Sequence, residues 1–367
     1  MNGNSTGKAF VFTCFGESHG TCMGTVLDGC PAGLPLSESD IQAEVDKRRP
    51  GFSTVSTARR EEDRVEILSG LYEGYTTGAP ICMVVRNRDV ESETYEQARN
   101  QPRPGHADYT ARVKYGGYND PRGGGRFSGR VTVTFVMAGA VAKKLLGMFG
   151  VEFLAHTVQI GKVKVNEEVG YARIRRNVYQ NPVRCAVPEK AALMEKEILR
   201  VAEEGDSVGG IVEAIALNVP AGLGEPIFDS LDSDIAKMVL NIPAVKGVEF
   251  GAGFRSASLR GSENNDPYVI RKGKIVTLSS NSGGILGGIS NGMPIVVRVA
   301  LKPTSSIAKR QKTVDLGRME ETEIEVAGRH DPCIVPRAVP VVESCLALVI
   351  ADHAIRSGKI PRVLGGR

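Results

Sequence analysis

The sequence contains one pattern twice, at a constant offset of 189 residues. GESHGTCMGTVLDGCPAGL (16–34) and GDSVGGIVEAIALNVPAGL (205–223) both begin with Gly-acid-Ser-x-Gly and end with Pro-Ala-Gly-Leu. Each continues into a predicted helix that contains Ser-Asp-Ile. Repetition constrains the fold because the same pattern favours the same supersecondary unit. We therefore expect a single domain over 1–367 whose two halves, about 8–165 and 190–356, have related structures.

Short apolar runs and helical segments alternate along both halves. Strands are predicted at 9–15, 78–85, 210–217 and 294–301. Helices are predicted at 38–48, 136–149, 188–204, 232–240 and 339–356, while 165–190 lacks clear periodicity. Ser37 is a predicted N-cap, and Pro188 and Gly205 bracket the third helix. Because helices are few relative to strands, we predict the α+β class, with helices packed on mostly antiparallel sheets rather than a doubly wound parallel sheet.

The composition is that of an ordinary globular protein, with 41% hydrophobic and 24% charged residues. No run reaches about 18 apolar residues, and MNGNSTGKAF has no apolar signal region, so we expect no membrane association. The seven cysteines include no CxxC pair, which favours reduced thiols in a cytoplasmic protein and no metal site. A net charge of +4 fits an anionic small molecule and is too weak to indicate nucleic-acid binding.

His19 is one of only five histidines, and the repeat bears on its role. Val208 occupies the equivalent position in the second copy, so the turn does not require a histidine for its shape. The alternative is a histidine that only packs within a turn. Because an unperturbed histidine titrates near pH 6.5, we favour proton transfer by His19. His156 and His353 lie in apolar or helical runs, where packed histidines are expected.

Five loops combine Arg or Lys with Gly or Pro, and most add a hydroxyl. They are RRPGFS (48–53), RPGHADYT (103–110), GGGRFSGR (123–130), KPTSS (302–306) and GRHDPC (328–333). Guanidinium groups, hydroxyls and backbone amides are donors to phosphate and carboxylate oxygens. Glycine clusters in several of these loops allow backbone to approach a ligand closely. The five loops together predict one shared anionic site, although neither an ATP P-loop nor a Rossmann motif is present.

These loops resemble one family. FGESHG, RRPG, RPGHADYT, PAGLGEPIFDSLDSDIA, VKGVEFG, GGILGGISNG, LKPTSSI and GRHDPC are together similar to the chorismate synthases, from about residue 8 to about 356. The resemblance implies anti-1,4-elimination of phosphate from 5-enolpyruvylshikimate 3-phosphate to give chorismate, the last step of the shikimate pathway. This lyase reaction has no net redox change yet requires reduced FMN. The resemblance also implies a β-α-β sandwich with internal pseudo-twofold symmetry, assembled as a homotetramer.

The resemblance also implies residue roles. His19 would protonate the departing phosphate and His106 would help protonate reduced FMN, although these two roles could be exchanged. Asp331 would act as a proton relay near flavin N5, and Arg48 and Arg49 would hold the substrate's anionic groups. The FMN contacts would come from Arg126, Ser128, Ala244, Gly287, Lys302, Pro303, Thr304, Ser305, Ser306 and Arg329.

The sequence departs from the family pattern at several positions. Thr54 replaces a second substrate arginine, Phe127 replaces a small hydroxyl residue, and Pro243 replaces Asn or Gln beside the flavin. Val131 and Phe135 replace an acid and a base together, which we interpret as a replaced ion pair, because an apolar exchange of a buried pair can be neutral. We expect these changes to affect ligand affinity and not the reaction.

Two other classes of protein fit the sequence less well. RGGGRFSGR is typical of RNA-binding segments, but such a protein needs many exposed aromatics, and here aromatics are 5% with no Trp. A flavin oxidoreductase would need a nicotinamide site, for which the sequence has no motif. Whether NADPH reduces FMN on this chain stays open at this point.

Overall fold

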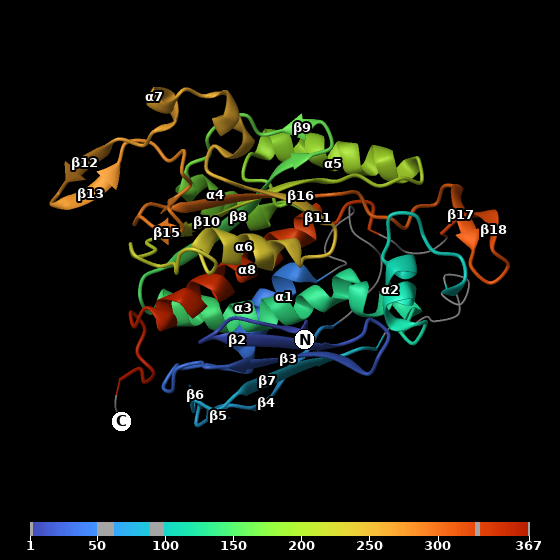
Figure 1. The fold of residues 1–367 in the computed structure, drawn as a ribbon, viewed down its shortest axis with the longest axis horizontal. Helices are drawn as coiled ribbons and strands as arrows, with labels where there is room; N and C mark the ends of the chain where they lie inside the picture. The colour runs from blue at the N-terminus through green and yellow to red at the C-terminus, as the bar shows by residue number, and fades with distance from the viewer. Residues whose placement is uncertain (1–2, 50–61, 89–98, 327–330, 366–367) are drawn as a thin grey trace.

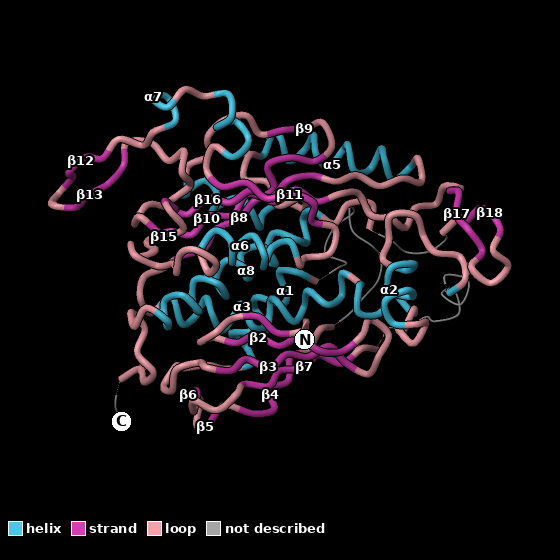
Figure 2. The backbone as a smooth tube through the Cα atoms, in the orientation of Figure 1, coloured by secondary structure: helices cyan, strands magenta, loops and turns pink. Residues whose placement is uncertain are grey.

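The structure, a computed structural model, describes residues 3–49, 62–88, 99–326 and 331–365. Two five-stranded antiparallel sheets enclose a layer of helices (Figures 1 and 2). The first sheet contains, in spatial order, β1 (Ser5–Thr6), β2 (Val11–Gly16), β3 (Cys22–Asp28), β7 (Ile81–Arg86) and β4 (Val65–Ser69). The second contains β11 (Val245–Phe250), β16 (Ile295–Leu301), β10 (Gly210–Leu217), β8 (Glu152–Ile160) and β9 (Val163–Lys164). The predicted α+β class with antiparallel sheets is therefore confirmed.

Four helices form the layer between the sheets, and smaller elements lie outside it. The inner helices are α1 (Glu38–Arg48), α3 (Thr132–Gly147), α6 (Leu231–Leu240) and α8 (Val335–Arg356). The other helices are α2 (Asp108–Tyr115), α4 (Tyr171–Asn177), α5 (Pro188–Glu203), α7 (Gly261–Asn264) and the 3₁₀ segments η3 (Arg122–Phe127), η4 (Gly129–Val131), η5 (Val178–Gln180) and η6 (Gly253–Ser258). The hairpins are β5–β6 (Leu71–Tyr72, Tyr75–Thr76), β12–β13 (Tyr268–Arg271, Lys274–Thr277), β14–β15 (Ile285–Leu286, Ile289–Ser290) and β17–β18 (Gln311–Asp315, Glu320–Ile324).

The two sheets have matching connectivity. In the first, β3 leads through α1 to β4 and then to its neighbour β7; in the second, β10 leads through α6 to β11 and then to its neighbour β16. After β7 of the first sheet the chain continues to the long inner helix α3, and after β16 of the second sheet it continues to the long inner helix α8. The strands β3 and β10 belong to the two copies of the repeated sequence pattern.

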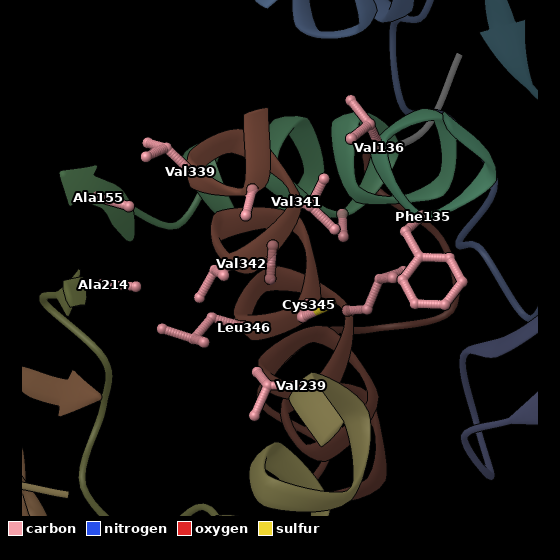
Figure 3. Packing of buried hydrophobic residues seen from close by; sticks show 14 of the residues in the cluster. Phe135, Val136, Ala155, Ala214, Val239, Val339, Val341, Val342, Cys345 and Leu346 are labelled. Carbon is pink, nitrogen blue, oxygen red and sulfur yellow. The ribbon is translucent and has the colours of Figure 1, made fainter. Parts of the chain in front are cut away.

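Helix α8 is the centre of the core. Most of its residues are apolar and buried, as expected of a helix that is surrounded by protein. Figure 3 shows Val341, Val342 and Leu346 of α8 among side chains of α3, α6 and the second sheet. By length and composition α8 could also cross a membrane, but 94% of its most apolar window is buried inside the structure, as in the core helix of a globular protein.

Predicted and observed elements agree best where capping signals are strong. Ser37 caps α1 in a capping box, in which its backbone N–H donates to Asp40 Oδ2 at 2.8 Å. Helix α8 starts before the predicted residue 339 because Pro336 falls in its first turn, where a missing N–H costs no helical hydrogen bond. Within 165–190, where no element was predicted, the structure forms α4.

Candidate active site

The glycine-rich η3 segment lies against both predicted catalytic histidines. Gly123 and Gly124 have φ of +59° and +81°, which favour glycine. A Cβ atom at Gly123 would lie 2.4 Å from Cδ2 of His19, and one at Gly124 would lie 3.2 Å from Cε1 of His106. Two consecutive glycines therefore approach two histidine side chains that are distant in the sequence, while close approach to a ligand stays a prediction.

His19 lies in the turn between β2 and β3 and is buried, with 6% of its surface exposed. The backbone N–H of Ser18 donates to the Gly125 carbonyl at 3.2 Å, which fixes this turn on the glycine segment. Arg126 donates to the carbonyls of Cys14 at 2.7 Å and Gly16 at 3.3 Å. The guanidinium of Arg126, predicted to contact FMN, therefore holds the strand that leads to His19.

His106 belongs to a charged cluster at the start of α2. Its Nδ1 lies 2.6 Å from Asp108 Oδ1, and Arg103 Nε donates to Asp108 Oδ2 at 2.7 Å. Burial opposes ionisation of Asp108, but hydrogen bonds from Arg103 and His106 outweigh it and hold the pKa of this carboxyl below its usual range. The ionised Asp108 can accept a hydrogen bond from Nδ1 of His106, and Arg103 Nη2 lies 3.1 Å from the same Nδ1 and 3.4 Å from Nε2.

The segment 302–306 packs directly on this cluster. Arg103 Nη1 donates to Ser306 Oγ at 3.1 Å, and Ser305 Oγ donates to the Gly105 carbonyl at 2.7 Å. Lys302 Nζ donates to Ser305 Oγ at 2.7 Å, and burial together with nearby Lys246 lowers the pKa of Lys302. The structure therefore joins two of the five predicted basic loops.

Two further predicted residues lie beside this segment. The backbone N–H of Lys302 donates to the carbonyl of Ala244, whose φ is +74°. Thr304 Oγ1 donates to the backbone carbonyl of Asp331 at 3.1 Å. Pro303 lies between these contacts in the chain, so the predicted residues Ala244, Lys302 to Ser306 and Asp331 converge.

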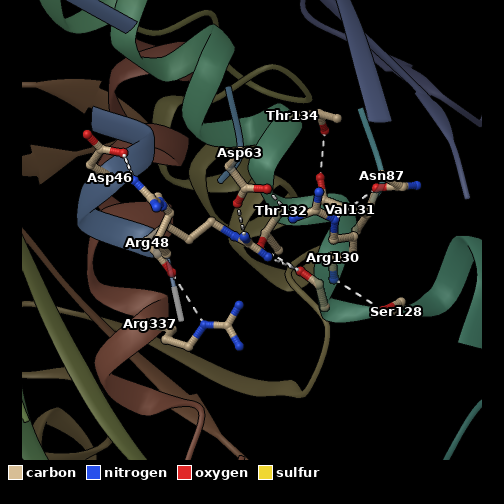
Figure 4. A network of polar contacts seen from close by, with 12 residues as sticks. Asp46, Arg48, Asp63, Asn87, Ser128, Arg130, Val131, Thr132, Thr134 and Arg337 are labelled. Carbon is tan, nitrogen blue, oxygen red and sulfur yellow. Dashed lines mark hydrogen bonds and ion pairs between the residues drawn. The ribbon is translucent and has the colours of Figure 1, made fainter. Parts of the chain in front are cut away.

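Arg48 is the centre of a second, more deeply buried charged cluster (Figure 4). With 2% of its surface exposed, it donates from Nε to Thr132 Oγ1 at 2.8 Å and from Nη2 to the Gly129 carbonyl at 2.9 Å. Its Nη1 lies 3.5 Å from Asp63 Oδ2. Burial and the nearby Arg337 lower the pKa of Arg48 to about 9. A buried guanidinium of this kind is suited to holding an anion.

Three members of this cluster were not predicted from the sequence. Arg130 forms an ion pair with Asp63, and Arg337 forms one with Asp331. Arg337 Nε also donates to the Arg48 carbonyl at 3.3 Å. Burial opposes ionisation of Asp63, but Arg130 and Arg48 outweigh it and hold its pKa below its usual range. Asp331 therefore lies between the two clusters, because its carboxylate meets Arg337 and its carbonyl meets Thr304.

The described contacts of three other predicted residues lie near their own positions in the chain. Arg49 forms an ion pair with Asp46 of its own helix at 2.9 Å, and Ser128 Oγ accepts from Arg130 N at 3.2 Å as the cap of η4. Gly287 lies in the β14–β15 hairpin, which is held near the start of β16 by Val296 N donating to the Gly283 carbonyl at 3.1 Å. Lys302 follows the other end of β16, about 20 Å away for a strand of this length. Arg329 and Thr54 lie outside the described residues.

The remaining sequence expectations concern packing. His156 and His353 are buried beside Glu213 and Asp234, as predicted for structural histidines. Val131 and Phe135 are buried, and Phe135 packs edge-to-face on Phe12 with ring centroids 5.2 Å apart. Both positions that depart from the family pattern are therefore apolar and buried, and Phe135 joins α3 to the first sheet.

Comparison with known proteins shows to which family the chain belongs. The family model described as chorismate synthase matches residues 10–355. The chain belongs to the chorismate synthase family. It is 54% identical to the chorismate synthase of Dehalococcoides mccartyi strain BAV1, over 98% of this chain and 99% of that protein. It is 57% identical to the chorismate synthase of Korarchaeum cryptofilum, over 97% and 99% of the two chains.

A solved structure supports the same conclusion. The protein described as "Crystal Structure of Chorismate Synthase" superposes with a TM-score of 0.77 at 34% identity, covering 96% of this chain and 93% of that one. Membership of the chorismate synthase family makes the chain a lyase of the shikimate pathway. The predicted family and reaction class are therefore confirmed.

Proposed function

We propose that the two charged clusters form one active site, which eliminates phosphate from 5-enolpyruvylshikimate 3-phosphate beside reduced FMN. The observation that carries the proposal is the contact of Gly123 with His19 and of Gly124 with His106. These contacts fix two histidines against consecutive residues of one glycine turn. Proton transfer at two neighbouring positions is what an elimination with a protonated leaving group requires.

The buried arginine cluster would hold the substrate. Arg48 and Arg130 pair with Asp63, and Arg337 pairs with Asp331, so three guanidinium groups gather in this cluster. In the described part of the chain, Arg48 Nη1 makes no hydrogen bond, which leaves a donor for an anionic oxygen. The proposed substrate carries a phosphate and two carboxylates, and guanidinium groups bind both of these through paired hydrogen bonds. Arg49 would contribute at the edge of this cluster.

His19 would donate its proton to the departing phosphate. Its burial limits exchange with water, and the cations of the buried cluster would stabilise the charge that develops on the leaving group. His106 would exchange a proton with the flavin through Nε2, since Asp108 holds Nδ1. Asp331 would relay a proton between the two clusters.

The His106 cluster and the segment 302–306 packed on it form an outer cluster, which fits a phosphorylated flavin. Lys302, Thr304, Ser305 and Ser306 supply ammonium and hydroxyl donors for its phosphate, with Arg126, Ser128, Ala244, Pro303 and Arg329 as further contacts. When bound, the reduced flavin would supply electron density to the substrate and recover it, with no net oxidation. Gly287 lies near the end of β16 that is opposite to Lys302. A contact between Gly287 and the flavin at this site would therefore come from a second copy of the chain.

We also infer an assembly and an internal symmetry. The family resemblance and Gly287 support a homotetramer in the cytoplasm. The matching connectivity of the two sheets and the repeated motifs support a pseudo-twofold relation between residues 8–165 and 190–356. The second half has Val208 in place of His19, so only one of the two related turns would transfer protons.

The test is anaerobic addition of 5-enolpyruvylshikimate 3-phosphate to the protein with reduced FMN. We expect a change in flavin absorbance, release of phosphate and formation of chorismate, with the flavin still reduced at the end. Shikimate 3-phosphate, which lacks the enolpyruvyl group, is the control and should release no phosphate. An unchanged flavin spectrum without product would contradict the proposal.

A further inference from the structure

The β12–β13 hairpin extends from one end of the molecule (Figure 1), and its strands carry exposed apolar side chains. Ile270 and Ile275 are direct cross-strand partners and are 78% and 70% exposed; Tyr268, two residues before Ile270, lies on the same face and is 61% exposed. The two strands form a sheet of their own. Because an isolated two-stranded hairpin is only marginally stable in water, this face is expected to be covered by a partner.

The same hairpin has a basic turn. Arg271, Lys272 and Lys274 are all exposed, and the segment 268–278 contains these three cationic residues and no acidic residue. The β12–β13 hairpin, called the basic arm from here on, therefore combines an apolar face with a strongly positive tip.

The β17–β18 hairpin has complementary properties and lies at the opposite end of the molecule (Figure 1). Residues 311–325 contain five acidic and two basic side chains, and Glu320, Glu321, Glu323 and Glu325 are exposed. Val314 and Glu321 are cross-strand partners, and Lys312 and Glu323 form the next pair on this outer face. Met319 in the turn is 83% exposed. This acidic hairpin thus offers apolar contact and negative charge on one surface.

We propose that the basic arm of one copy docks on the acidic hairpin of a second copy. The net charges of the two hairpins are opposite and equal, and both have exposed apolar side chains. Because they lie at opposite ends, a two-fold rotation would place each basic arm on the other copy's acidic hairpin. The pair is then closed by two identical contacts. This inference rests on the proposed assembly of several copies and identifies the surfaces that hold two of them together.

The contact reaches the candidate active site through the acidic hairpin. On its inner face, Thr313 Oγ1 donates to the Pro102 carbonyl at 2.5 Å, and Leu316 N donates to the Asn100 carbonyl at 2.9 Å. Pro102 precedes Arg103, which binds Asp108 and Ser306. A basic arm on the outer face would therefore press the hairpin onto the segment that positions the His106 cluster.

The experiment uses two charge-reversed chains and their mixture. One carries R271E, K272E and K274E, and the other carries E320K, E321K and E323K. Each alone brings like charges together at both contacts, so we expect association at least about 100-fold weaker than in the unaltered chain, measured by sedimentation velocity in low salt. Mixed one to one, the two chains restore both opposite-charge contacts and should reassociate.

The control carries K164E, R176E and K196E, which reverse three exposed cations outside the two hairpins, and should assemble like the unaltered chain. Circular dichroism confirms that each variant is folded. If the arm variant assembles like the control, or if the folded mixture stays dissociated, the docking inference is wrong while the proposed assembly stands. A monomeric unaltered chain would overturn both.

Discussion

Replacing Gly123 with alanine should displace the ring of His19 while keeping its imidazole group. The variant therefore tests whether the position of His19 limits the rate. The new Cβ would lie 2.4 Å from Cδ2 of His19, and carbon atoms pack at about 3.5 Å, so the ring must move by about 1 Å. A misplacement of this size costs about 100-fold in rate when a reacting group is displaced. The alanine would also keep φ at +59°, which costs about 1 kcal/mol of stability. We therefore expect turnover to fall about 100-fold with only a small loss of stability.

Gly117→Ala is the matched control for Gly123→Ala. Gly117 has φ of +82°, and a Cβ there would meet nothing within 4 Å. It therefore imposes the same kind of backbone strain without a contact at a histidine. The assay is anaerobic turnover at saturating reduced FMN, with urea unfolding of the same preparations. Equal turnover of the two variants, after correction for folded protein, would refute the proposal that the position of His19 limits the rate.

Three further predictions follow from the same geometry. His19→Ala should lower turnover by about 10²–10⁴, the range for loss of a general acid, and should leave the melting temperature nearly unchanged because the repeat tolerates valine in this turn; a large loss of melting temperature with normal turnover per folded enzyme would show that the histidine only fills the turn. FMN should bind more tightly with substrate present, because Asp331 links the outer cluster, through Thr304, to the buried cluster, through Arg337, and equal dissociation constants in titrations with and without substrate would contradict this coupling. Asp108→Asn should cost about 3 kcal/mol in urea unfolding at neutral pH, as expected when one partner of a buried charged cluster is removed. Because the pKa of Asp108 is lowered in the folded state, its contribution is present above the unfolded pKa and is lost as the pH falls through the folded pKa; a cost of the same size in strong acid would contradict this reasoning.

Local sequence signals predicted the elements that they directly specify. Ser37 and Asp40 form their capping box within one turn, so α1 was predicted with its observed bounds. The strand at 210–217 was also predicted with its observed bounds, since its apolar run ends at a turn. Helix α3 begins at Thr132, before the predicted start, because its Val and Thr residues have weak helix preference and are buried by tertiary packing between sheet and helices.

The sequence predicted the part of the site whose residues lie within one short motif. His106 stands out within RPGHADYT, and its partners Arg103 and Asp108 lie in the same motif, where an acid two residues after a histidine was an available signal. Arg130, Arg337 and Asp63 carry no such local signal. They meet Arg48 only because α1, α3 and α8 pack together, and such long-range contacts cannot be found from motif spacing.

The position of Arg337 has a consequence for how the site opens. Arg337 lies in the first turns of α8, the helix at the centre of the core, and it binds both Asp331 and the Arg48 carbonyl. The buried arginine cluster is therefore tied to backbone whose amide protons should exchange with solvent only when the whole domain unfolds. The His106 cluster depends instead on the segments 100–107 and 302–306, which lie outside the helices and sheets. Amides in such segments can exchange through local openings of lower free energy. On warming, we expect the cluster proposed to bind the flavin to open first, while the buried arginine cluster persists until the fold itself melts.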